Sequence, residues 1–300
     1  MSVGLERRVP STSLGGIEMS EHHHWKGYLL VDNGDSLFIQ SPYMLEEKIV
    51  YGSDSDETTM AIAAIQYMKH KGHRIDSVHL PQSVDSSSLF LATGTDSILN
   101  NELLDFEEVK WNLLSGEEAT LVLAKTDVEE FEFDTPSGIE LIDGQFYTDI
   151  CDAWSMEKAE THVSQGAYVS QSQYREGARA RLSLASQKVS SGIIWPPRQL
   201  DSSGQRIPSE SQPLTGEAIV ESWTKLSAAG APSEFSLRAP ILGGIQTLLV
   251  SFEQGPRGVF LVCDDVDYSP SIGDKVEFSV RRIYGQEGVI RYGLKALPLQ

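Results

Sequence analysis

The feature that most constrains this chain is a series of five short apolar runs near its C-terminal end, separated by turns that contain glycine. Residues 255–258 (Gly-Pro-Arg-Gly) and 271–274 (Ser-Ile-Gly-Asp) form two of these turns. No helical period lies between the runs. Short strands joined by tight turns are typical of a small Greek-key barrel. We therefore predict a barrel at residues 211–300, with strands at residues 216–226, 241–252, 259–263, 275–283 and 288–296.

The first half of the chain follows a different pattern, in which helices and strands alternate. Residues 27–31 and 36–39 are apolar and flank Asn33-Gly34, a dipeptide typical of a two-residue hairpin. An apolar helical period begins after Asp56 and ends near Gly72. Asp56 can cap the first turn of this helix. Alternating helices and strands indicate an α/β layer. The chain as a whole is therefore predicted to be α+β.

Shorter runs predict the remaining elements of this half. Strands are expected at residues 75–80 and 119–124, and edge strands at residues 129–134 and 139–143. Residues 87–99 are expected to form a strand, a turn at Gly94-Thr95-Asp96 and then a short helix. These expectations divide the chain into four segments: a loose or disordered terminus at 1–24, an acidic α/β domain at 25–160, a connection with a hairpin at 161–210, and the barrel at 211–300.

The charge of the chain is concentrated in its first half. The formal net charge is −19, and the first 164 residues hold 30 acidic and 10 basic residues, whereas the rest hold 13 and 14. An acidic surface repels the phosphate backbone, which argues against nucleic acid as a partner of this half. For the barrel, the aromatic residues that could stack on bases are Trp223, Phe252, Phe260, Phe278 and Tyr284, and strand alternation is expected to bury most of them.

The expected location is the cytoplasm. The chain has two cysteines, Cys151 and Cys263, which are far apart in the sequence. Their small number fits a reduced protein, and a single disulfide between them is the alternative. No apolar run approaches the ~18 residues that a membrane-spanning helix needs. The first 20 residues lack the apolar segment of a secretory signal. We expect no membrane partner.

A strand-like run at residues 192–195 leads into Pro196-Pro197-Arg198, directly before the predicted barrel. Together with residues 174–177 (Tyr-Arg-Glu-Gly), Arg181-Leu182 and the turn Ile272-Gly273-Asp274, this aromatic-Pro-Pro-Arg element resembles the acyl-CoA-associated OB-fold family. In that family the barrel follows a rubredoxin-like zinc ribbon. The resemblance covers under half of the chain, and it implies a five-stranded OB-fold barrel, enzyme partners and an association with acyl-CoA.

The family's four zinc-binding cysteines are missing from this sequence. An ungapped match places the first C-x-x-C pair at Gln187 and Ser190 and the second pair at Asp201 and Gly204. Structural zinc needs four thiolate or imidazole ligands in a tetrahedral arrangement. We therefore predict a degenerate ribbon that holds no metal. Packing around Trp195 and hydrogen bonds in the turns are expected to stabilise it instead. The alternative is that these residues form an unrelated surface hairpin.

The first half carries a fainter resemblance. Three segments are similar to the opening of a thiolase-superfamily synthase of the hydroxymethylglutaryl-CoA synthase type. They are residues 54–61 with their helix, residues 77–80 and residues 117–123. The chemistry of that superfamily needs an activated cysteine. Cys151 stands next to Asp152, whose negative charge disfavours a thiolate. We therefore assign no catalytic residue.

These observations favour a non-catalytic accessory or scaffold protein that docks a thiolase or a hydroxymethylglutaryl-CoA synthase-like enzyme and helps to bind or transfer acyl-CoA. No cofactor is expected to be held tightly, with coenzyme A or acyl-CoA as the candidate ligand. Two alternatives stay open: a divergent thiolase-like acyl-transfer enzyme and an OB-fold that binds nucleic acid. Candidate contacts for a CoA phosphate or for the partner are Trp195, Arg198, Arg257, Arg281, Arg282 and Arg291.

Overall fold

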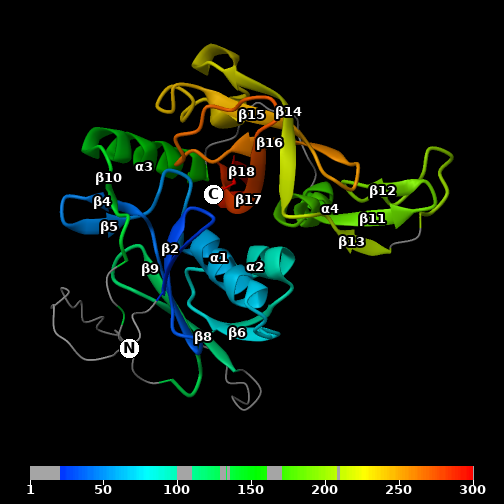
Figure 1. Ribbon diagram of the computed structural model, residues 1–300. Helices are drawn as coiled ribbons and strands as arrows, with labels where there is room; N and C mark the ends of the chain where they lie inside the picture. The colour runs from blue at the N-terminus through cyan, green and yellow to red at the C-terminus, as the bar shows by residue number, and fades with distance from the viewer. Residues whose placement is uncertain are drawn as a thin grey trace. The chain divides into compact units, whose positions relative to one another are not determined.

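A computed structural model describes residues 21–99, 110–128, 133, 136–160, 171–207 and 210–299. The chain divides into two compact units, Met1–Gly144 and Gln145–Gln300, which we call the N-terminal unit and the barrel unit. The architecture is mixed α+β, with a closed five-stranded barrel in the second unit (Figure 1). None of the helices in the described residues is both long and apolar enough to cross a membrane.

A seven-stranded mixed sheet forms the centre of the N-terminal unit, in the order β1-β2-β3-β9-β8-β6-β7. Strand β6 pairs in parallel with β7 and β8, whereas the other neighbours are antiparallel. The strands are β1 (Glu21–Trp25), β2 (Tyr28–Asp32), β3 (Ser36–Gln40), β6 (Ser77–Leu80), β7 (Asp96–Leu99), β8 (Trp111–Ser115) and β9 (Thr120–Lys125). A smaller sheet holds β10 (Glu140–Leu141), β4 (Tyr43–Leu45) and β5 (Lys48–Val50).

The local signals of this unit are largely confirmed. Strands β2 and β3 form the hairpin predicted from Asn33-Gly34, and Asp32 Oδ1 accepts a hydrogen bond from Gly34 N at 2.8 Å within the turn. Helix α1 (Glu57–His70) begins after Asp56, whose carboxylate accepts from Thr59 N at 3.0 Å. Thr59 Oγ1 accepts in turn from Asp56 N, which completes a capping box.

The prediction for residues 87–99 was wrong, because the order of helix and strand is reversed. Helix α2 (Ser86–Thr93) comes first and strand β7 follows it. The Asp85 carboxylate accepts from Ser88 N at 2.6 Å, so this residue caps the helix, and Gly94 ends it with φ of 68°. These two caps outweigh the strand-like apolar run between them.

The predicted N-terminal and edge segments differ in extent from the structure. Residues 21–24 belong to β1 and pair with β2, whereas we expected a loose segment up to residue 24. Pairing with β2 gives the backbone N–H and C=O groups of these residues hydrogen-bond partners, which explains why they form a strand. The predicted edge strand at residues 129–134 lies almost entirely outside the described residues, as do residues 1–20 and 161–170.

The predicted barrel at the C-terminal end is confirmed. Its five strands close in the order β14-β15-β16-β18-β17, with β16 and β18 parallel and the other pairs antiparallel. Inward-facing side chains such as Val220, Leu248, Val250, Phe260 and Phe278 form its core. The strands are β14 (Glu217–Leu226), β15 (Ile245–Ser251), β16 (Arg257–Val262), β17 (Lys275–Gln286) and β18 (Val289–Pro298).

Three further parts complete the barrel unit. A small sheet has the order β12-β11-β13, made of β11 (Ala185–Val189), β12 (Gly192–Ile194) and β13 (Ser211–Pro213), and it follows helix α4 (Gln171–Leu182). Two short 3₁₀ helices, η1 (Ala228–Gly230) and η2 (Ser233–Phe235), lie between β14 and β15. Helix α3 (Gly144–Lys158) belongs to this unit from Gln145 onward, whereas we placed the domain boundary at residue 160. The difference arises because buried ion pairs join α3 to the barrel, and no pattern in the sequence predicts them.

Candidate functional site in the barrel unit

The barrel unit contains a pocket of about 360 Å³ at one end of the barrel. Its wall is made of the last residues of β14, the start of β15 and the connection that follows β16. Concave sites are where proteins bind small molecules, and polar groups supply most of the exposed lining of this one. Residues that line it include Trp223, Lys225, Leu242, Gln246, Asp264 and Tyr268.

A β-bulge decides which residues of β14 face this pocket. Val220 pairs with Val250, but the next pair joins Ser222 and Leu249, so Glu221 is the extra residue. A bulge shifts the alternation of the strand by one position. As a result Trp223 pairs with the buried Leu248 and shares its face. Lys225 pairs with Gln246 on the same face, beyond the end of the packed core.

A buried network of charges lies beside the pocket and is centred on Arg238. Its guanidinium donates from Nε to Glu157 Oε1 at 2.8 Å and from Nη1 to Asp264 Oδ2 at 3.1 Å. Its third nitrogen donates to the Ile283 carbonyl at 2.5 Å. Lys295 Nζ lies 2.9 Å from Asp264 Oδ2, so this carboxylate meets two cations. Because Arg238 and Glu157 are 1% and 0% exposed, the network joins α3 to the barrel without help from solvent.

Trp154 fixes α3 against the same arginine. The Arg238 Cζ atom lies 3.8 Å from the centre of the Trp154 ring, and Arg282 Cζ lies 4.3 Å from it. A guanidinium over an aromatic face is a favourable cation–π contact. The Glu157 carboxylate also accepts from Gly285 N at 3.2 Å. Side chains one turn apart on α3 therefore clamp it to β17.

The connection after β16 is held by turn hydrogen bonds around Asp274. Its carboxylate accepts from Tyr268 Oη at 2.9 Å and from Ser271 N at 2.8 Å. Burial, together with this bond, raises the pKa of the Tyr268 phenol well above its usual range. Gly273 donates to the Val220 carbonyl at 2.8 Å, which ties the turn to β14. Asp274 thus positions Tyr268, which lines the pocket.

The four positions that we expected to be degenerate metal-ligand positions lie in or near the small sheet, and two of them form side-chain hydrogen bonds. Gln187 Oε1, in β11, accepts from Arg198 N at 2.9 Å. The Asp201 carboxylate accepts from Ser203 Oγ at 2.7 Å and from Gln205 N at 2.9 Å, and these bonds hold the pKa of that carboxyl below its usual value. Gly204 has φ of 80°, a backbone region that favours glycine. Ser190 lies in the turn between β11 and β12. An amide, a hydroxyl, a carboxylate and a glycine do not fit a structural zinc ion.

Trp195 faces the barrel rather than solvent. Its ring stacks on Phe260 with centres 5.3 Å apart and lies 6.3 Å from Phe252. A Cβ atom added at Gly258 would come within 2.7 Å of the Trp195 ring, so this glycine makes room for it. Trp195 therefore joins the ribbon-like sheet to the barrel core.

The predicted arginines do not gather at one site. Arg257 is exposed and pairs with Glu221 at 3.0 Å, and Arg198 is also exposed. Arg291 lies in β18. Arg282 covers Trp154, whereas Arg281 is fully buried and donates to Ser279 Oγ at 2.5 Å. Arg198 and Arg257 are exposed and Arg282 and Arg291 are partly exposed, whereas Arg281 is buried.

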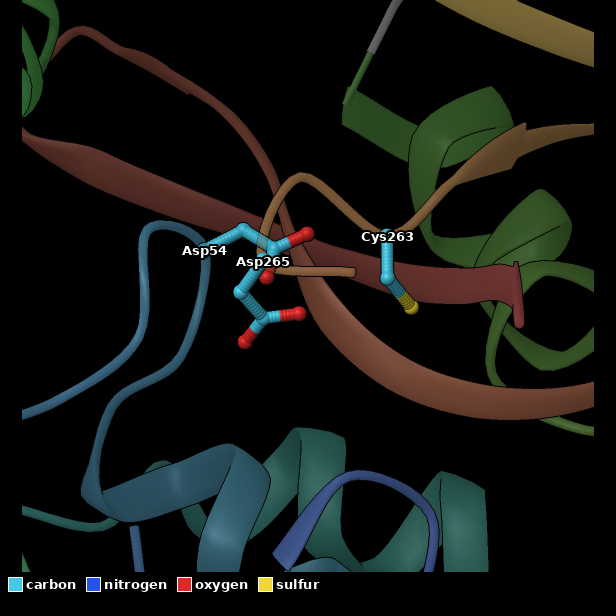
Figure 2. A group of neighbouring side chains, drawn as sticks. All are labelled: Asp54, Cys263 and Asp265. Carbon is cyan, nitrogen blue, oxygen red and sulfur yellow. The ribbon is translucent and has the colours of Figure 1, made fainter. Parts of the chain in front are cut away.

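The two cysteines lie in different settings. Cys263 is buried directly after β16, and Asp265 lies on the same connection, whereas Asp54 lies on the loop that leads into α1 (Figure 2). Cys151 is half-buried and lies about two turns into α3, away from the helix N-terminus that would favour a thiolate.

No pattern in the sequence predicted the residues that form the charged network beside this pocket. Glu157, Arg238, Asp264 and Lys295 carry no motif, and nothing in their spacing indicates that they meet. Trp223 was considered only as a barrel aromatic, and simple alternation from Val220 would place it on the opposite face of β14. The bulge at Glu221 leaves no clear signal in the sequence.

Comparison with known proteins gives little to place beside this geometry. No family model matches the chain, and no curated protein matches it. Among solved structures, one match is described as "Ltp2-ChsH2(DUF35) aldolase". That alignment covers 43% of this chain and 98% of the other, with 13% sequence identity and a TM-score of 0.31.

Proposed function

We propose that this protein is a non-catalytic accessory protein whose barrel unit docks an enzyme of the thiolase superfamily and helps to hold or transfer its acyl-CoA. The observation that carries the proposal is an apolar patch on the outer face of the barrel, formed by Ile219, Leu249 and Val259. Ile219 is 47% exposed and Val259 is 68% exposed. Leu249 pairs with Val259, and Ile219 pairs with Ser251 on the same face.

The border of this outer patch is charged. Arg257 pairs in register with Ser251, and its guanidinium forms an ion pair with Glu221. Exposed apolar side chains with a polar border are typical of protein interaction surfaces. The strands beneath the patch belong to the closed barrel, so the surface needs little ordering when a partner binds.

Arg198, Arg257 and Arg291 are the residues that we propose to meet coenzyme A. A guanidinium presents paired donors that match phosphate oxygens, and coenzyme A carries several phosphate charges. Arg281 and Arg282 are already engaged within the unit, and Trp195 packs on the barrel core. These three residues would stabilise the barrel surface rather than contact coenzyme A.

The positions of the cysteines support a role without covalent catalysis. An acyl-transfer enzyme of this superfamily needs an activated thiol beside a base. Cys263 is 2% exposed, and Cys151 lies within α3 beside Asp152. The sequence resemblance supplies the identity of the partner, and the outer patch supplies a surface for it.

Co-purification tests the proposal. The full chain should retain a thiolase-superfamily enzyme at physiological salt, and the double variant Ile219→Asp, Val259→Asp should lose it. Val289→Asp is the matched control, because Val289 is 45% exposed at the β17–β18 hairpin, outside the outer patch. Retention of no such enzyme would overturn docking, and turnover of a thioester by the chain alone would overturn the non-catalytic role.

A further inference from the structure

The pocket at the end of the barrel presents side chains that the docking role does not use. Trp223, Lys225, Gln246 and Asp267 all line it. Among the described residues, the side chains of these four make no hydrogen bond or ion pair with one another or with a neighbour. They are therefore available to a ligand.

The pocket has a defined shape because its surroundings are fixed. Asp264, in its wall, is already neutralised by Arg238 and Lys295. Asp274 holds Tyr268 and the following turn. On the other side, a Cβ atom added at Gly244 would lie 2.7 Å from the Leu226 carbonyl oxygen and 3.2 Å from the Lys225 side chain, so the glycine allows β14 and its lysine to pass close by.

The four available side chains differ in chemistry and complement one kind of molecule. The half-exposed indole of Trp223 offers a flat surface on which a planar ring can stack. Lys225 offers an ammonium group to an anion. The Gln246 amide and the Asp267 carboxylate can accept hydrogen bonds from ring or exocyclic N–H groups. A volume of about 360 Å³ lies within the range of small-molecule sites.

We propose that this pocket binds a small ligand in which a planar, N–H-bearing heterocycle carries an anionic group, the class that includes purine nucleoside monophosphates. Stacking on Trp223 supplies most of the contact area, and Lys225 selects the anionic form. The site uses none of the arginines proposed for coenzyme A, and the inference does not rest on the docking function.

Titration calorimetry of the full chain with adenosine monophosphate tests the site. Binding should be detectable, with adenosine and inorganic phosphate each binding more weakly because each lacks one half of the recognised group. Coenzyme A, which carries the same ring and phosphates, forms a separate arm. If it binds equally tightly and competes with the monophosphate, the source of the ligand group is coenzyme A and the chemistry of the site stands.

Two variants give the residue assignment. Lys225→Gln and Trp223→Leu should each weaken binding on the order of tenfold, the effect of losing one charge-assisted or stacking contact. Lys275→Gln, at an exposed lysine outside the pocket, should bind as the unchanged chain does. The circular dichroism of each variant checks its fold. Absence of binding at millimolar monophosphate, or equal affinity in all three variants, would overturn the proposal.

Discussion

Gln187 Oε1 accepts a hydrogen bond from the Arg198 backbone N–H at 2.9 Å. Gln187 stands where the resembling family has its first metal-binding cysteine, and Arg198 ends the aromatic-Pro-Pro-Arg element. Gln187 is 4% exposed, so this bond is made away from solvent. A buried amide thus joins β11 to the segment that follows β12.

This bond predicts the effect of Gln187→Leu. Because the substitution leaves the Arg198 N–H without its partner, the free energy of unfolding of the barrel unit should fall by about 1–3 kcal/mol. Chemical denaturation followed by tryptophan fluorescence measures the change. Gln199→Leu is the control, since Gln199 is exposed and should change stability little. Equal stability of the two variants would contradict the structural role of Gln187.

The four degenerate ribbon positions predict that the protein folds without zinc. Gln187, Ser190, Asp201 and Gly204 offer no thiolate or imidazole, so a chelator should leave the melting temperature unchanged. Mass spectrometry of the purified full chain should find zinc well below one ion per chain. A stoichiometric ion, or a fall in melting temperature on chelation, would show that other residues form a metal site.

Arg238→Met should destabilise the attachment of α3 to the barrel. The change removes the buried cation that pairs with Glu157 and leaves Asp264 with Lys295 alone, and breaking comparable buried pairs costs about 3–5 kcal/mol. Hydrogen exchange of the α3 and β18 amides measures this effect directly, because the chain has two units and global unfolding need not be two-state.

The matched control for this prediction is Arg257→Met. Its ion pair with Glu221 is solvent-exposed, with the arginine side chain 66% accessible, so its removal should cost no more than about 1 kcal/mol. If α3 keeps its protection in Arg238→Met, the network does not hold the helix.

His79 predicts a pH dependence of the N-terminal unit. Burial in β6 lowers the pKa of His79 below its usual 6.5, so the folded state favours the neutral imidazole. Above about pH 6.5 the side chain is neutral in both states and its contribution is constant. As the pH falls below that value, the unfolded chain takes up the proton first, and the free energy of unfolding decreases.

A proton NMR titration of the histidines measures this shift, and His79→Gln identifies the signal. We expect a midpoint below 6.5 for His79 and a weaker acid sensitivity in the variant. A midpoint at or above 6.5 would mean that protonation stabilises the folded unit, which is the opposite sign.

Much of the fold could be predicted because its signals are local. Asp56 caps α1 within its own first turn, and Asn33-Gly34 closes a hairpin between adjacent strands. The error at residues 87–99 arose where two local signals competed. An apolar run favoured a strand, but the caps at Asp85 and Gly94 enclosed a helix.

The sequence by itself determined the cap of α1, the hairpin at Asn33-Gly34 and the five barrel strands, since each depends on residues close together in the chain. Only the tertiary structure decided where α3 belongs and which side chains face the pocket. Glu157 meets Arg238 across 81 positions and Gly285 across 128, and the bulge in β14 moves Trp223 to the inner face. Such contacts depend on closure of the barrel, which brings together residues whose order in the chain gives no sign of their meeting.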